Sequence, residues 1–150
     1  MTIRYTTICL AMSGLLAAAN AAACDMSLFE LPAGGPKPAP STGNASLDAW
    51  SKPLTIEWHD ATSSVCNVLE FHKISAHGSA QVSWYYPRWY DKKHNKWQEA
   101  GSEDHDIAIQ NGGVDFKLQS GHEVLIQLQP GGAYRALFKG QYPGVVTPMS

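Results

Sequence analysis

The chain has 150 residues, of which 16% are charged, and 11 Lys and Arg against 13 Asp and Glu give a formal net charge of −2. The basic residues form no stripe, so binding to nucleic acid phosphates or adsorption to an anionic membrane surface is disfavoured. This length suits one domain rather than two.

Residues 1–23 have the parts of an export signal. Arg4 supplies the basic region, an apolar region runs from Ile8 to Ala19, and Ala21-Ala22-Ala23 offers the small residues that a signal peptidase accepts. The apolar region is too short to span a bilayer, and no later apolar run approaches about 20 residues. We therefore expect a cleaved bacterial signal peptide, no transmembrane segment, and a periplasmic or secreted protein.

The cysteines agree with export. Cys9 falls within the predicted signal peptide, which leaves Cys24 and Cys66 in the mature chain. An even number of cysteines in an oxidising compartment predicts a disulfide bond. The alternative is a lipid anchor on Cys24, because small residues precede it, but the large aliphatic residue usual three positions earlier is absent. Lipidation would also leave Cys66 as a free thiol, so the sequence favours the Cys24–Cys66 bridge.

Residues 24–53 are expected to form an arm or linker. The stretch from 31 to 44 is dense in proline and glycine, so it buries too little apolar area to offset its ordering entropy. If Cys24 pairs with Cys66, the far end of this arm is pinned back and the arm becomes a long surface loop.

From residue 54 the sequence alternates as half-buried strands do. We expect strands at residues 54–58, 65–74, 81–90, 107–109, 114–118, 124–128 and 133–139, separated by turns such as Asn111-Gly112-Gly113 and Pro130-Gly131-Gly132. About seven short strands with regularly spaced turns predict an all-β domain over residues 54–142. The expected architecture is a single antiparallel β-sandwich, immunoglobulin-like or jelly-roll-like, followed by a C-terminal tail at residues 143–150.

The sharpest functional feature is the aromatic segment WYYPRWY at residues 84–90, with Trp97 shortly after it. Successive side chains of a strand face opposite sides, and a sandwich has one interior, so one aromatic set should lie on the surface. Tryptophan, tyrosine and arginine dominate protein-binding hot spots, and lysines in the loop 91–96 could meet acidic groups of a partner. The candidate binding residues are Tyr85, Arg88, Trp89, Lys92, Lys93, Lys96 and Trp97. The alternative is that Trp84 is core, the other rings cap a sheet end, and the loop is a solvated turn.

A second cluster, Glu103-Asp104-His105-Asp106, gathers carboxylates around an imidazole and is a weak candidate metal site. The alternative is an acidic surface loop, because the chain has no H-E-x-x-H, C-x-x-C or calcium-loop spacing. It also lacks G-x-S-x-G, and no pair of carboxylates stands out, so we expect neither catalysis nor a cofactor.

The sequence thus predicts a small exported binding module. Its favoured partner is another protein, as for an inhibitor or immunity protein against an envelope enzyme, or for an adhesin-like accessory protein. One alternative is a carbohydrate-binding module that stacks sugars on the same aromatic rings. A weaker alternative is a metal-binding envelope protein.

Overall fold

The structure is a computed structural model that describes residues 24–59 and 64–150. The predicted signal peptide lies outside the described residues. The helices are η1 (Met26–Leu28) and α1 (Ala45–Asp48), and the strands are β1 (Leu54–His59), β2 (Ser64–Ile74), β3 (Ser79–Tyr86), β4 (Trp89–Asp91), β5 (Lys96–Gln98), β6 (Gly101–Ala108), β7 (Gly113–Lys117), β8 (Glu123–Leu128), β9 (Tyr134–Phe138) and β10 (Tyr142–Pro148). Within the described residues, no helix is long and apolar enough to cross a membrane.

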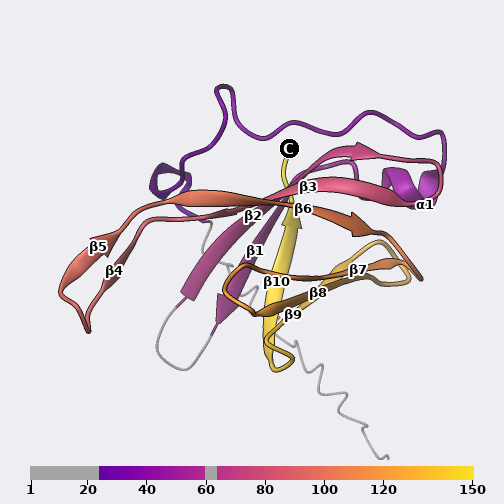
Figure 1. The fold of residues 1–150 in the computed structure, drawn as a ribbon. Coiled ribbons are helices and arrows are strands. Elements are labelled where there is room, and N and C mark those ends of the chain that lie inside the picture. The colour runs from indigo at the N-terminus through magenta and orange to yellow at the C-terminus, as the bar shows by residue number, and fades with distance from the viewer. Residues whose placement is uncertain (1–23, 60–63) are drawn as a thin grey trace, which may run out of the picture.

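Eight strands form one sheet in the order β6-β3-β2-β1-β10-β9-β8-β7, and its neighbouring strands pair antiparallel. The sheet curls into an almost closed barrel (Figure 1), because β10 returns to pair with β1. The two remaining edges, β6 and β7, are joined by a tight turn in which Gln110 and Gly113 exchange two backbone hydrogen bonds of 2.9 Å. Beyond β7, the amide of Gln119 donates to both carboxylate oxygens of Glu103 in β6, at 3.1 and 3.2 Å. The Glu103 side chain therefore connects the β6 edge to the segment that follows β7, where the two edges share no further backbone hydrogen bonds among the described residues.

The prediction of an all-β fold is confirmed, whereas a two-sheet sandwich is not confirmed. Short antiparallel strands show the same alternation of apolar and polar residues whether two sheets pack face to face or one sheet curls into a barrel. The spacing and alternation of strands therefore cannot distinguish a sandwich from a barrel. The predicted tail at residues 143–150 is strand β10 for most of its length and lies between β1 and β9. The sequence suggested a final edge segment or a frayed tail, yet Pro143 and Gly144 have partners in β9.

The core lies inside the barrel and is closed at one end by the segment around α1. Side chains that point inward from β1, β2, β3 and β8, such as Ile56, Leu69, Val82 and Ile126, are buried. At the closed end, Trp50 is 0% exposed, with ring centroids 5.8 Å from Phe71 and 5.3 Å from Tyr134. The hydroxyl of Tyr134 donates to the carbonyl of Ala49, which fixes this segment to β9.

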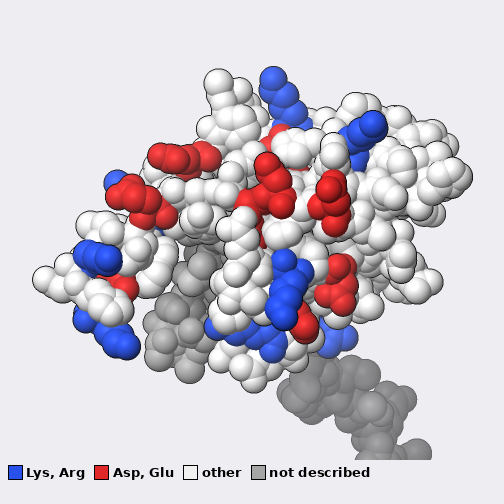
Figure 2. All heavy atoms as spheres, viewed as in Figure 1, with Lys and Arg blue, Asp and Glu red and all other residues white. Residues whose placement is uncertain are grey.

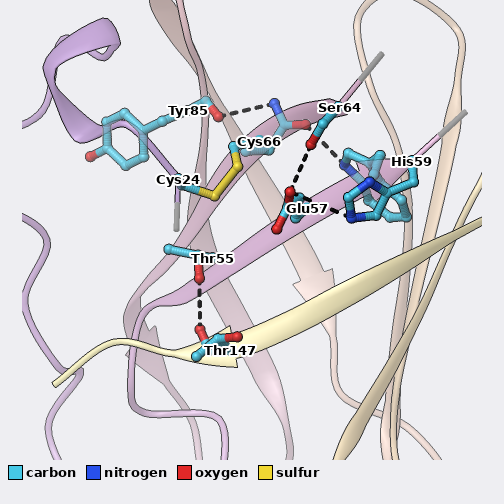
Figure 3. Close-up of a disulfide and its surroundings, with 10 residues drawn as sticks. Cys24, Thr55, Glu57, His59, Ser64, Cys66, Tyr85 and Thr147 are labelled. Atoms are coloured by element: carbon cyan, nitrogen blue, oxygen red, sulfur yellow. Dashed lines mark hydrogen bonds and ion pairs between the residues drawn. A yellow bond between two sulfur atoms is a disulfide. The ribbon is translucent and has the colours of Figure 1, made fainter. Parts of the chain in front are cut away.

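The first part of the arm, residues 24–44, packs along the outside of β2 and β3, across the top of Figure 1, whereas its end around α1 closes the barrel. The predicted Cys24–Cys66 disulfide is present and fastens its start to β2, with Cα atoms 5.7 Å apart (Figure 3). Farther along, the amide of Arg88 donates to the carbonyl of Leu28 at 2.8 Å, and the amide of Lys37 donates to Glu70 at 2.8 Å. The sulfur of Cys24 is thus bonded to that of Cys66.

Gly144 in β10 makes room for an aromatic ring of the neighbouring strand. A Cβ at this position would lie 2.6 Å from Cζ3 of Trp58, whose indole nitrogen is held by the side-chain oxygen of Asn67 at 3.0 Å. The ring cannot retreat without losing this hydrogen bond, so Gly144→Ala should lower the free energy of unfolding by about 1–3 kcal/mol, the usual cost of overpacking. Urea titration measures the loss.

The same substitution in a Trp58→Leu background supplies the control, because it removes the two closest contacts, with the Trp58 ring, and leaves only the milder contact of 3.1 Å with Cγ2 of Ile56. The cost of Gly144→Ala should then fall clearly, as expected for a coupled pair. An equal cost in both backgrounds would show that the ring is not its cause.

Candidate functional site

A two-stranded hairpin, β4 and β5, extends beyond the barrel at the left of Figure 1. It continues from β3 and leads back into β6. The sequence predicted one strand at residues 81–90, but Pro87 and Arg88 divide it into β3 and β4. Proline lacks the N–H that a sheet ladder needs, so the main sheet ends there and the hairpin pairs with itself.

The tip of this hairpin is ordered by Asp91. Its carboxylate accepts hydrogen bonds from the amides of Lys93 and His94, at 3.0 and 3.2 Å, and from the His94 ring at 2.7 Å. The bond from the His94 side chain is the largest of the effects that hold the pKa of Asp91 below its usual range. Asn95 takes a positive φ of 51°, and its side-chain oxygen accepts from the hydroxyl of Tyr90. The turn is therefore preorganised by its own hydrogen bonds.

One face of the hairpin presents Arg88, Tyr90 and Trp97, which we call the hairpin face. Tyr90 and Trp97 are directly opposite one another across β4 and β5, with ring centroids 5.5 Å apart. They remain 42% and 57% exposed. The guanidinium carbon of Arg88 lies 5.4 Å from the centroid of the Trp97 ring, within the range of a cation–π contact.

Trp89 alternates to the other side of β4, and there it lines the cavity at the base of the hairpin. The predicted surface residues Arg88 and Trp97 are thus brought together, Trp89 is separated from them, and Tyr90 is a member that the prediction missed.

The hairpin is basic although the chain is acidic. Residues 88–98 contain Arg88, Lys92, Lys93 and Lys96 against the single acid Asp91, while the whole chain has a net charge of −2. The three lysines are exposed. Figure 2 shows several basic side chains at the hairpin end on the left, while acidic and basic side chains are interspersed over the rest of this face. The predicted lysines therefore surround the tip that carries the exposed rings.

Tyr85, predicted as a surface binding residue, is buried instead. It points outward from the barrel but is only 6% exposed, because the arm covers this part of β2 and β3. Its hydroxyl donates to Glu70 at 2.8 Å, and burial, with this hydrogen bond second, raises the pKa of Tyr85 to about 12. Local sequence could not reveal a cover that comes from residues far away in the chain.

The four weak metal candidates do not converge on one point. They alternate along β6, so Glu103 and His105 face the barrel interior, where Nε2 of His105 lies 2.9 Å from Glu103. Asp104 faces outward and accepts from the hydroxyl of Ser83 at 2.5 Å. Among residues 24–59 and 64–150, no group of three or more His, Cys, Asp or Glu side chains could hold a metal ion. The predicted cluster is a strand with two faces rather than an acidic loop.

Among the described residues, the end of the barrel opposite α1 forms a mouth that holds a cavity of about 630 Å³. Six aromatic residues line it: Trp58, Trp84, Tyr86, Trp89, Phe138 and Tyr142. The side chain of Glu103 also lines it and is 8% exposed. Sequence reasoning missed this cavity, because each strand contributes only one or two residues and no linear motif results.

The structure thus offers two candidate binding features, the hairpin face and the mouth, and Trp89 belongs to the mouth. Comparison of the chain with protein-family models, with curated proteins and with solved structures finds no match, so the features themselves carry the functional argument.

Proposed function

We propose that the protein is an exported binding module that recognises an acidic surface of another protein through the hairpin face. The observation that carries this proposal is the exposed pair Tyr90 and Trp97, with Arg88 against the Trp97 ring. These three residue types are the ones enriched in binding hot spots. The rings present large apolar area at the end of a projection, where a partner can reach them.

The order of the hairpin supports this proposal. Association normally costs the entropy of fixing mobile side chains and loops. Here Asp91 already fixes the turn, and Tyr90 is held both by Trp97 and by Asn95. Little further ordering is needed when a partner docks, so more of the contact energy appears as affinity.

The charges support a partner with an acidic surface. Lys92, Lys93 and Lys96 surround the tip, so complementary charges on a partner would be steered toward the exposed rings. An inhibitor or immunity protein against an envelope enzyme, or an adhesin-like accessory protein, would use such a surface. The Cys24–Cys66 bridge supports an oxidising location, in the periplasm or outside the cell.

Carbohydrate binding through the same rings is the weaker alternative. Tyr90 and Trp97 stand at 64° to one another rather than in a common plane. A glycan chain that stacks on successive rings would need them to form a flatter platform. The tilted pair instead suits insertion between side chains of a protein surface.

The test begins with capture of the partner from the envelope and culture fluid of the source bacterium, using the chain from residue 24 onward. Isothermal titration with that partner should show that Trp97→Ala weakens binding by more than about 2 kcal/mol, the scale of a hot spot. Val145→Ala is the matched control, since Val145 is also an exposed hydrophobic residue but lies on β10 of the barrel. Its affinity should equal that of the wild type.

The lysines should act on the association rate. Changing Lys92, Lys93 and Lys96 to glutamine should slow association and flatten its dependence on salt. A partner that binds Trp97→Ala as tightly as wild type would place the interface elsewhere. Saturable quenching of tryptophan emission by soluble oligosaccharides, without any protein partner, would favour the carbohydrate alternative.

A further inference from the structure

The mouth of the barrel has the dimensions of a small-molecule site. Its volume of about 630 Å³ lies within the range of roughly 300–1,000 Å³ that is usual for ligand pockets. An eight-stranded barrel is just wide enough to hold one small ligand in its interior. The segment around Trp50 closes the opposite end, so the mouth is a pocket rather than a channel.

Three of the aromatic residues that line this pocket are held in place by their neighbours. Trp84 is buried and stands edge-on to Phe116 with ring centroids 5.8 Å apart, and Trp58 is held by its hydrogen bond to Asn67. Phe138 packs against Trp58 with ring centroids 5.2 Å apart. The ring faces carry partial negative charge, so a group of them attracts a cation that has lost its water.

Glu103 is the acidic group that lines the pocket. Its side chain is more than nine-tenths buried, and it accepts hydrogen bonds from the amide of Gln119 and from the ring of His105. His105 is itself packed against Phe116, with ring centroids 5.1 Å apart. A carboxylate has about four acceptor sites, so these three contacts leave capacity for a donor from a ligand.

The cationic groups of the pocket lie at its rim. Lys139 is exposed, in the turn between β9 and β10, and its ammonium lies 5.4 Å from the centroid of the Phe138 ring. His59 is half exposed and lies 3.4 Å from Glu57, on the outer side of β1. Of the charged residues that line the cavity in the described chain, Glu103 is therefore the one whose side chain is buried, whereas Lys139 is exposed.

We infer that the barrel mouth binds a small organic cation, an amine or quaternary ammonium group carried on an apolar body. The apolar body fills the aromatic walls, and the charged group meets Glu103 and the ring faces. An anion of the same shape would lie against Glu103 in a site of low dielectric, where repulsion is strong. This site is separate from the hairpin face and goes beyond the proposed protein binding.

The test uses three probes with the same alkyl chain and different head groups, each below its micellar concentration: dodecyltrimethylammonium, dodecanoate and dodecyl maltoside. Titration followed by tryptophan emission and calorimetry should give one saturable site for the cation. Its affinity should exceed that for dodecanoate by at least about tenfold, which corresponds to the loss of a favourable charge contact. Dodecyl maltoside should bind with intermediate affinity.

Glu103→Gln should weaken dodecyltrimethylammonium binding by about tenfold and leave dodecyl maltoside binding nearly unchanged. Asp115→Asn is the matched control, because Asp115 is exposed on the outer face of β7 and should have no effect. If Glu103→Gln fails to fold, Ser120→Trp serves instead: Ser120 is an exposed residue lining the mouth, and a ring there should weaken binding of all three probes.

Equal or tighter binding of dodecanoate would overturn the inference, as would the absence of saturable binding by all three probes. So would wild-type affinity for the cation in a folded Glu103→Gln variant. Trp97→Ala should bind the cation as the wild type does, since Trp97 does not line the cavity. A failure of the protein-binding proposal would therefore leave the cation-binding results unchanged. A failure of the cation-binding inference would likewise leave the protein-binding results unchanged.

Discussion

Replacing Trp50 by alanine should lower the free energy of unfolding by about 3–5 kcal/mol, the usual cost of removing a large buried aromatic side chain. The ring is fully buried at the closed end of the barrel, between Phe71 and Tyr134. Within the described residues its indole nitrogen has no hydrogen-bond partner, so the substitution sacrifices packing and no hydrogen bond. Guanidinium titration monitored by circular dichroism measures the loss.

Trp97→Ala is the control for this measurement, because it removes the same side chain from an exposed position. Its effect on stability should stay within about 0.5 kcal/mol, as for most surface substitutions. If Trp50→Ala costs no more than Trp97→Ala, the segment around α1 does not close the barrel in the way described.

Replacing both Cys24 and Cys66 by serine should cost about 4 kcal/mol of stability. The bridge spans 42 residues, and the chain-entropy model gives roughly this value for a loop of that length. The variant should also loosen the arm, because the bridge holds its first residue against β2. Amide hydrogen exchange should then speed up at Val68 and Tyr85, which the arm covers.

Reduction supplies an independent check on the same bond. Wild type in reductant should match the double serine variant in both stability and exchange. A loss below 1 kcal/mol, with protection of Val68 unchanged, would show that the remaining arm contacts suffice without the bridge.

The strands that the sequence predicts best are those with apolar residues at every second position. Val114, Phe116 and Leu118 alternate with charged residues, and the predicted strand matches β7 closely. β6 was predicted only at residues 107–109, although it spans Gly101–Ala108. Its inward positions carry the polar residues Glu103 and His105, and they hide the alternation of apolar residues that identifies a strand.

The residues of the two candidate sites also differ in how well the sequence predicts them. The exposure of Arg88 and Trp97 could be predicted. Both lie near a turn in a segment rich in aromatic and basic side chains, and one small core cannot bury all of them. The burial of Tyr85 could not, because it depends on an arm brought back by a disulfide and by the contact of Lys37 with Glu70. The mouth could not be predicted, because it depends on the pairing of β1 with β10, and no local sequence pattern indicates that pairing.

That pairing also bears on how the protein folds. The hydroxyl of Thr55 in β1 donates to the carbonyl of Thr147 in β10, 92 residues later, at 3.1 Å (Figure 3). A contact between such distant residues costs a large loop-closure entropy before it stabilises the chain. This cost slows folding. Until β10 arrives, β1 and β9 are both open edges. The nascent chain therefore cannot complete its barrel until β10 has been synthesised.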